Sequence, residues 1–149
     1  PATEVISCGE PVDSDYSILN RYKVTHRGSK VAIVALGSFY GLGQSVASLL
    51  KEKENIDATL INPRYITGID SELMNELKAD HELVITLEDG VLDGGFGEKI
   101  SRYYGTSDMK VLNYGAKKEF VDRYDLQECL RANHRTDEQI VEDITALIR

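Results

Sequence analysis

The sequence predicts an α/β fold, a three-layer α/β/α sandwich around a mostly parallel, mixed sheet of about five strands. Continuous apolar runs such as residues 31–36 have the composition of strands that are buried on both faces. Between these runs, apolar residues recur every three or four positions, as in helices that pack on a sheet. Strands that alternate with helices in this way form parallel sheets through right-handed crossovers.

The first part of the chain is expected to supply an edge strand, the central strand and a long helix. Residues 22–25 alternate as a short edge strand does, whereas residues 31–36 are apolar throughout and predict the centre of the sheet. After Gly37, an apolar stripe at helical spacing predicts the helix, and its members are Leu42, Val46, Leu49 and Leu50.

Three further strands are predicted at residues 57–61, 83–87 and 109–112. Asp70 is placed to cap a short helix between the first two of them, because its side chain can accept from the free amides of a first turn. Each of these strands therefore belongs to a strand-helix step.

Two more helices are expected in the second half of the chain. One follows a glycine-rich loop and carries an apolar stripe of Phe96, Ile100, Tyr103 and Tyr104. The last helix opens with the capping box of Thr136 and Gln139. It must dock on the domain, since it is too short to be stable alone, and its apolar face consists of Ile140, Val141, Ile144, Leu147 and Ile148.

Composition excludes several classes of function. Asp and Glu number 25 against 17 Lys and Arg, and the net charge is −8. No basic run interleaved with aromatic residues offers a surface for nucleic acid. The apolar stretches are far shorter than a membrane span, and the N-terminus lacks the pattern of a signal peptide. We therefore expect a cytoplasmic protein without nucleic-acid or membrane partners.

The chain begins at Pro1 rather than Met, which favours a piece of a longer polypeptide. Residues 1–29 are expected to be an N-terminal arm and edge strand at the end of a linker from a missing preceding domain. Residues 30–149 are long enough for one domain with its own core.

Cysteine and histidine spacing predicts neither a disulfide nor a metal site. Cys8 and Cys129 are far apart and outside any CxxC pair, so both are expected to be plain thiols. His26, His81 and His134 are isolated from one another and from the cysteines, which gives no metal-ligand or nucleophile-base pair. We expect the histidines on the surface or in loops.

Residues 37–43 form a glycine-containing turn between a strand and a helix, the position of a dinucleotide-binding loop. The glycine spacing differs from the Rossmann fingerprint, and Asn62 stands where that fold places an acidic residue. The glycines are explained more simply by a tight strand-to-helix turn. A nucleotide- or anion-binding module remains an alternative.

Residues 88–97 are the most unusual segment, because they combine glycines with carboxylates at the carboxyl end of a strand, where ligands of parallel sheets collect. Glu88, Asp89 and Asp93 would repel a phosphate, and Asp93 is placed to cap the following helix. Two interpretations stay open: a glycine turn with a self-capped helix, and a packing surface for another domain or subunit.

Asp89-Gly90 followed by Asn113 imitates the magnesium and diphosphate signature of thiamine enzymes, which starts Gly-Asp-Gly and ends in asparagine. Glu88 replaces the first glycine, and Asn113 belongs to a different strand-helix step from that of the signature. We interpret the match as a coincidence.

Four segments in order resemble the C-terminal domain of 1-deoxy-D-xylulose-5-phosphate synthases, a thiamine-diphosphate-dependent family of the transketolase superfamily. The resemblance spans about residues 20 to 149. Residues 60–65 resemble the family's Val-Asp-x-Arg-Phe strand end, with Asp70 after it, and residues 81–97 supply the second specific part. The remaining segments are residues 31–38 and 111–115.

The resemblance implies a transferase that condenses pyruvate with glyceraldehyde 3-phosphate, with loss of carbon dioxide, for isoprenoid and thiamine biosynthesis. Thiamine diphosphate and Mg would be bound by the two preceding domains, which are not in this chain. The fragment itself would bind no cofactor or metal and carry no catalytic residue. It would pack against those domains and a second subunit of a homodimer, and the candidate interface residues are Arg64, Glu88, Asp89, Gly94, Gly95, Phe96 and Gly97.

The chain also departs from the family pattern. Asn62 replaces an Asp, Thr67-Gly68 stands where Lys-Pro is usual, and Lys117-Lys118 stands where Pro-Asp is usual. The same domain occurs in transketolases and in the beta chains of 2-oxo acid dehydrogenases, which remain alternatives, and so does a separate subunit that joins catalytic chains.

Overall fold

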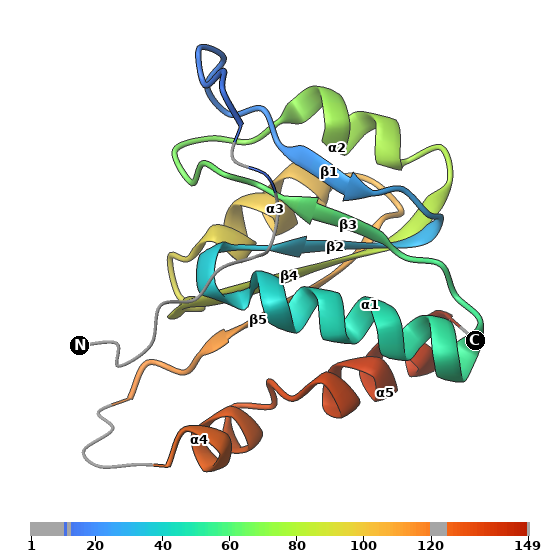
Figure 1. Cartoon of the computed structure of the whole chain (residues 1–149), viewed down its shortest axis with the longest axis vertical. Helices are drawn as coiled ribbons and strands as arrows, with labels where there is room; N and C mark the ends of the chain where they lie inside the picture. Colours follow the sequence, from blue (N-terminus) through green and yellow to red (C-terminus); the bar gives the residue numbers. More distant parts are fainter. Residues whose placement is uncertain (1–10, 12, 120–124, 149) are drawn as a thin grey trace.

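A five-stranded mixed sheet forms the middle layer of the computed structural model, which describes residues 11, 13–119 and 125–148 (Figure 1). The order across the sheet is β1-β3-β2-β4-β5, in which only β1 runs antiparallel to its neighbour. The predicted fold class is confirmed. The strands are β1 (Lys23–His26), β2 (Lys30–Ala35), β3 (Thr59–Asn62), β4 (His81–Val91) and β5 (Lys110–Ala116).

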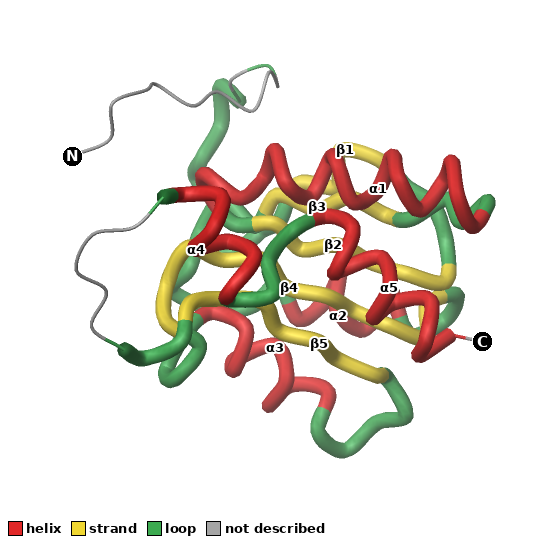
Figure 2. Tube along the Cα trace, turned by 90° about the horizontal axis from the view of Figure 1, so that it is seen from below, coloured by secondary structure: helices red, strands yellow, loops and turns green. Residues whose placement is uncertain are grey.

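Helices cover both faces of the sheet (Figures 1 and 2). Helix α1 and helix α5 pack on one face, and α2 and α3 pack on the other. A 3-10 turn, η1, leads into α1, and α4 follows β5 along the chain. The bounds are η1 (Gly37–Phe39), α1 (Tyr40–Glu54), α2 (Ser71–Leu77), α3 (Phe96–Tyr104), α4 (Leu126–Ala132) and α5 (Asp137–Ile148).

The central strand β2 divides the core into two halves because its side chains alternate between the faces of the sheet. Val31 and Ile33 join the cluster under α1 and α5, while Ala32 and Val34 join the cluster over α2 and α3. All four are fully buried. A strand with helices on both faces needs apolar residues at every position, which explains the continuous run.

Two predicted helix caps are confirmed. The Asp70 carboxylate accepts the amide of Leu73 at 3.2 Å and also the amide of Tyr22 at 2.9 Å, so it joins α2 to the segment before β1. The amides of Thr136 and Gln139 are each accepted by the other residue's side chain, at 3.2 and 3.3 Å, as in a capping box.

The structure differs from the sequence prediction at three places. Strand β4 continues to Val91, so residues 88–91 are extended strand and not loop. Helix α4 was not predicted; the Asp125 carboxylate caps it by accepting two first-turn amides. The expectation of a surface His81 is wrong: it begins β4, and its buried ring contacts Thr59 Oγ1 at 2.8 Å and the Asp80 carboxylate at 2.6 Å.

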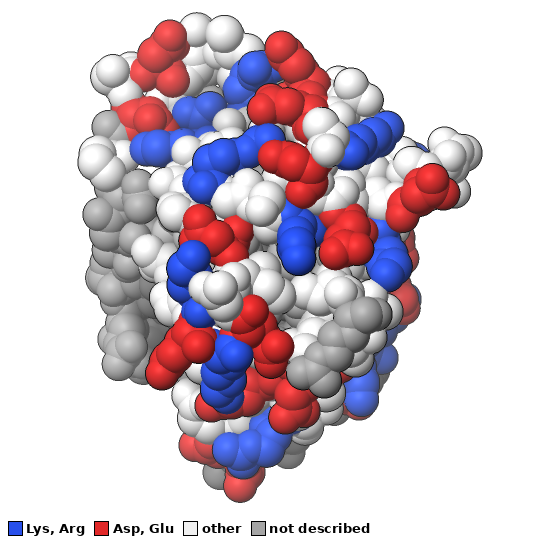
Figure 3. Space-filling model, turned by 90° about the vertical axis from the view of Figure 1, so that its right-hand side faces the viewer, with Lys and Arg blue, Asp and Glu red and all other residues white. Residues whose placement is uncertain are grey.

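Cys129 is a free, half-buried thiol, and Cys8 lies outside the described residues. No helix in the described part of the chain is both long and apolar enough to cross a bilayer. On the face shown in Figure 3, basic and acidic side chains are interspersed, so that this face carries no field of a single sign.

Because Tyr22 is buried, the free energy of unfolding should depend on pH in the alkaline range. The ring packs against Phe96, the hydroxyl donates to Gly68 O at 3.0 Å, and burial raises the pKa of Tyr22 to about 12. An unfolded tyrosine loses its proton near pH ~10. The free energy of unfolding should therefore fall as the pH rises from about 10 toward 12, because only the unfolded state releases the proton readily.

Urea unfolding of the chain and of Tyr22→Phe between pH ~9 and ~11 measures this contribution. Tyr22→Phe should flatten the alkaline decline, whereas Tyr16→Phe, at an exposed ring, should leave it unchanged. An identical slope in the chain and in Tyr22→Phe would contradict the assignment.

Candidate functional site

The carboxyl ends of the parallel strands β2, β4 and β5 lie at one edge of the sheet, where three connections begin. Ligand and partner sites of open α/β sheets collect at this edge. The predicted site segment, residues 88–97, runs from the end of β4 into the first turn of α3.

The Glu88 carboxylate organises this segment from the inside. Glu88 is 3% exposed, and its Oε2 and Oε1 accept the amides of Phe96 and Gly97, each at 2.9 Å. Both amides belong to the first turn of α3, where the helix supplies no acceptor of its own. The negative charge also lies at the positive end of the helix dipole. One side chain at the end of β4 thus fixes where α3 begins.

The glycines of the segment leave room for this carboxylate. A Cβ on Gly95 would lie 2.6 Å from Glu88 Oε1, and a Cβ on Gly97 would lie 2.6 Å from Thr86 Oγ1. Gly94 has a φ of +74°, which favours glycine. Glycine is therefore required at positions 95 and 97 because neighbouring side-chain atoms approach closely. It is favoured at position 94 because the φ angle is positive.

A polar network lies next to Gly97. Thr86 Oγ1 donates to Asn113 Oδ1 at 2.8 Å, and Asn113 Nδ2 donates to Ser101 Oγ at 2.7 Å. The Asn113 amide thereby joins β4, β5 and α3. Its polar atoms are engaged within the domain.

The expectation that Asp93 caps α3 is wrong. Asp93 is exposed, and the cap comes from Glu88, eight residues before the helix. The spacing rule for caps considers only neighbours in sequence, whereas β4 ends beside the first turn of α3 in space. The sequence suggests that Glu88, Asp89 and Asp93 crowd one loop, whereas in the structure Glu88 is buried and the other two are exposed.

The predicted interface residues divide into an inner and an outer group. Glu88, Phe96 and Gly97 are buried and hold the loop. Asp89 and Gly94 are exposed, and Gly95 is half-buried. Val91, which the sequence did not single out, is 39% exposed. Within residues 88–97, only the outer group has surface available for contact with another chain or domain.

Arg64 lies after β3, apart from this loop, and fastens the segment that precedes β1. Its guanidinium donates to Arg21 O at 2.8 and 3.1 Å and to the Asp13 carboxylate at 3.1 Å. The cation also lies within 6 Å of the ring centroids of Tyr16 and Tyr65. Its contacts within the domain are already extensive.

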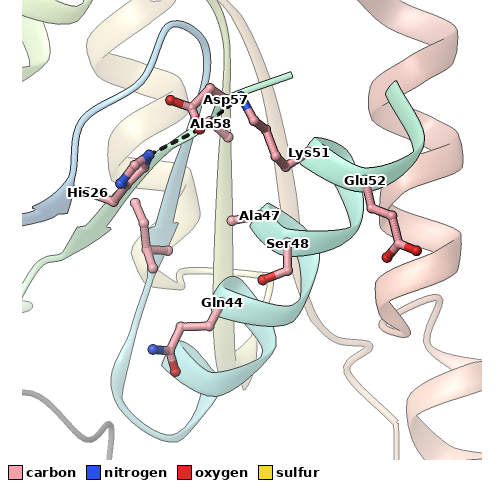
Figure 4. Close-up of a pocket in the computed structure, with 9 residues that line it drawn as sticks. His26, Gln44, Ala47, Ser48, Lys51, Glu52, Asp57 and Ala58 are labelled. Carbon is pink, nitrogen blue, oxygen red and sulfur yellow. Dashed lines mark hydrogen bonds and ion pairs between the residues drawn. The ribbon is translucent and has the colours of Figure 1, made fainter. Parts of the chain in front are cut away.

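A cavity of about 510 Å³ lies elsewhere, between α1 and the strands β1 and β3 (Figure 4). Three of the residues that line it interact: His26 Nε2 lies 3.2 Å and Lys51 Nζ 3.6 Å from Asp57 Oδ1. Glu52 lines the cavity as well.

Arg135 is the principal residue that sequence reasoning missed. It is 4% exposed and lies between α4 and α5, and its burial has no sequence signal, because arginine is normally at the surface. In the described part of the chain, no group of three or more His, Cys, Asp or Glu residues is arranged to hold a metal ion.

Comparison with known proteins identifies the class. The family model for the transketolase C-terminal domain matches residues 20–140, and the chain belongs to this family. A split gene transketolase, described as an inactive beta4 tetramer, has a TM-score of 0.75 at 25% identity over 85% of this chain and 42% of that one. A transketolase from Pichia stipitis has the same fold, with a TM-score of 0.58.

Two of the most similar curated relatives are of one kind of enzyme. The chain is 34% identical over 94% of its length to the 1-deoxy-D-xylulose-5-phosphate synthase of Symbiobacterium thermophilum, and 32% identical over 86% to that of Clostridium tetani. It spans only 22% and 21% of those two proteins. The similarity therefore concerns one domain of much longer enzymes.

Glu88→Gln tests the role assigned to the buried carboxylate. The amide keeps the shape of the side chain but offers an NH₂ group to one of the two backbone donors, and it removes the charge. The free energy of unfolding should fall by about 1.5–3 kcal/mol, the range for hydrogen bonds to charged groups. Urea denaturation measures the change.

Asp89→Asn is the matched control, since it removes the neighbouring exposed carboxylate. It should stay within about 0.5 kcal/mol of the unchanged chain. Equal effects of Asp89→Asn and Glu88→Gln would refute the special role of Glu88.

Proposed function

We propose that this chain is the C-terminal assembly domain of a thiamine-diphosphate-dependent enzyme that makes 1-deoxy-D-xylulose 5-phosphate. The observation that carries the proposal is the similarity to such synthases over nearly the whole chain. The parent enzyme would be a cytoplasmic homodimer that joins pyruvate to glyceraldehyde 3-phosphate with loss of carbon dioxide, for isoprenoid and thiamine biosynthesis.

The geometry of the carboxyl edge supports a structural role. The buried Glu88 carboxylate is occupied by two backbone amides, and the Asn113 amide by Thr86 and Ser101. In this proposal these groups hold the domain together and do not act as general acids or bases, a role that needs a group within reach of substrate. Thiamine diphosphate and Mg would be held by the preceding domains, with no cofactor, metal or catalytic residue contributed by this chain.

The partner surface of this proposal is the outer side of residues 88–97. Asp89, Val91 and Gly94 are exposed there, on a backbone that Glu88 holds in place. An interface benefits from such preorganisation, because no loop entropy is lost on contact. Arg64 is the second proposed contact, beside the exposed Ile66.

A second candidate is a separate subunit of a split transketolase. It is favoured by the TM-score of 0.75 with the split gene transketolase, which is well above that with the Pichia stipitis enzyme. The upstream coding sequence separates the candidates. Two preceding domains in the same reading frame support the synthase, whereas a stop codon before Pro1 supports the separate subunit.

The assembly role predicts an effect of Val91→Asp in the parent enzyme. A charge at this position would be buried without a partner in the interface, so the fraction of assembled dimer and the synthase activity should fall at least about tenfold. Light scattering after gel filtration and product formation from pyruvate and glyceraldehyde 3-phosphate measure the two quantities.

Val24→Asp is the control, because Val24 is exposed to a similar extent, 36% against 39%, in the edge strand β1, which β3 and β2 separate from β4. It should leave assembly unchanged. Normal assembly of Val91→Asp would overturn the proposed surface. Micromolar binding of thiamine diphosphate with Mg²⁺ to this chain alone, measured by calorimetry, would overturn the assembly-only role.

A further inference from the structure

Arg135 places an unpaired cation inside the domain. In the described part of the chain, Nε and Nη1 of its guanidinium are buried and have no hydrogen-bond partner. Its contact is the face of the Phe39 ring, whose centroid lies 5.2 Å from Cζ. A ring face attracts a cation but satisfies no N–H donor in the way an oxygen does. A buried guanidinium without an acceptor is unfavourable, so this group is suited to an external anion.

A cavity of about 280 Å³ adjoins this guanidinium and is lined by residues from the start of α1 and from helix α4. Most of its wall is apolar, so it suits a ligand with an apolar body. The polar residues that line it are Ser38, Asp89 and Arg135. The apolar walls are formed chiefly by Phe39, Leu42, Leu126 and Leu130.

The start of α1 adds a second source of positive potential. Neither η1 nor α1 has a side-chain cap or an acidic residue in its first turn. The helix dipole therefore favours negative charge at this end of the cavity. The two features are independent of each other, since one is a side chain after α4 and the other is the backbone before α1.

We propose that this cavity binds a small organic carboxylate that carries an apolar group. One guanidinium compensates one negative charge, and its planar fork matches a carboxylate. Asp89 at the cavity wall disfavours a dianion such as phosphate. Asp89 belongs both to the wall of this cavity and to the outer side of residues 88–97. The proposal does not depend on the identity of the parent enzyme.

Benzoate is the probe, because it combines one carboxylate with one ring. Added to the 149-residue chain, it should raise the melting temperature and shift the amide resonances of Phe39, Leu42 and Arg135. Acetate lacks the apolar group and should bind more weakly, as should inorganic phosphate. Equal binding of acetate, stronger binding of phosphate, or no response to benzoate would overturn the proposal.

Arg135→Met tests the cation, with Arg131→Met as the matched control at an exposed arginine of α4. Arg135→Met should bind benzoate at least about tenfold more weakly, and Arg131→Met should bind it normally. Without benzoate, Arg135→Met should melt about 2–4 °C higher, because it removes a buried unpaired charge. A large loss of stability would show that the guanidinium is paired within the fold and would contradict the proposal.

Leu126→Glu tests the cavity without changing the core. Leu126 is 63% exposed and lines the cavity, so a carboxylate there should compete with benzoate while the melting temperature stays near that of the unchanged chain. Loss of the benzoate response in this variant supports the site. Undiminished binding of benzoate would place the ligand elsewhere and overturn the proposal.

Discussion

The buried carboxylate of Glu88 is the contact on which the carboxyl edge of this domain depends. It lies at the end of the parallel part of β4 and accepts the first two amides of α3. One carboxylate therefore links the strand to the helix that follows it. The close packing of Gly95 and Gly97 around Glu88 and Thr86 follows from this geometry. A helix start that is held from within leaves its outer surface free for another role.

This arrangement explains how a loop rich in carboxylates and glycine can serve assembly. The charge of Glu88 is satisfied inside the domain, and the exposed side carries Val91 and Gly94 together with the carboxylates of Asp89 and Asp93. The family relationship is consistent with this division, because the chain corresponds to about a fifth of the synthases that it resembles. In the proposed parent enzyme, chemistry belongs to the preceding domains, and this domain contributes a rigid surface.

Patterns that depend on near neighbours in sequence were sufficient for most of the fold. The apolar run at residues 31–36 identified the central strand, and Asp70 and Thr136 marked two helix starts correctly. The candidate site was less accessible, since it depends on contacts between distant residues. Asp93 was predicted as the cap because it lies close to α3 along the chain. Arg135 gave no signal, because only the packing of α4 and η1 determines that it is buried.

Amide hydrogen exchange at Phe96 and Gly97 tests the central role of Glu88 most directly. First-turn amides of a helix exchange rapidly unless a side chain accepts them. If the Glu88 carboxylate accepts both, the two amides should exchange as slowly as those in the buried part of β4, and Glu88→Gln should remove this protection. Exchange of both amides in the unchanged chain as fast as that of the exposed Gly94 would contradict the account.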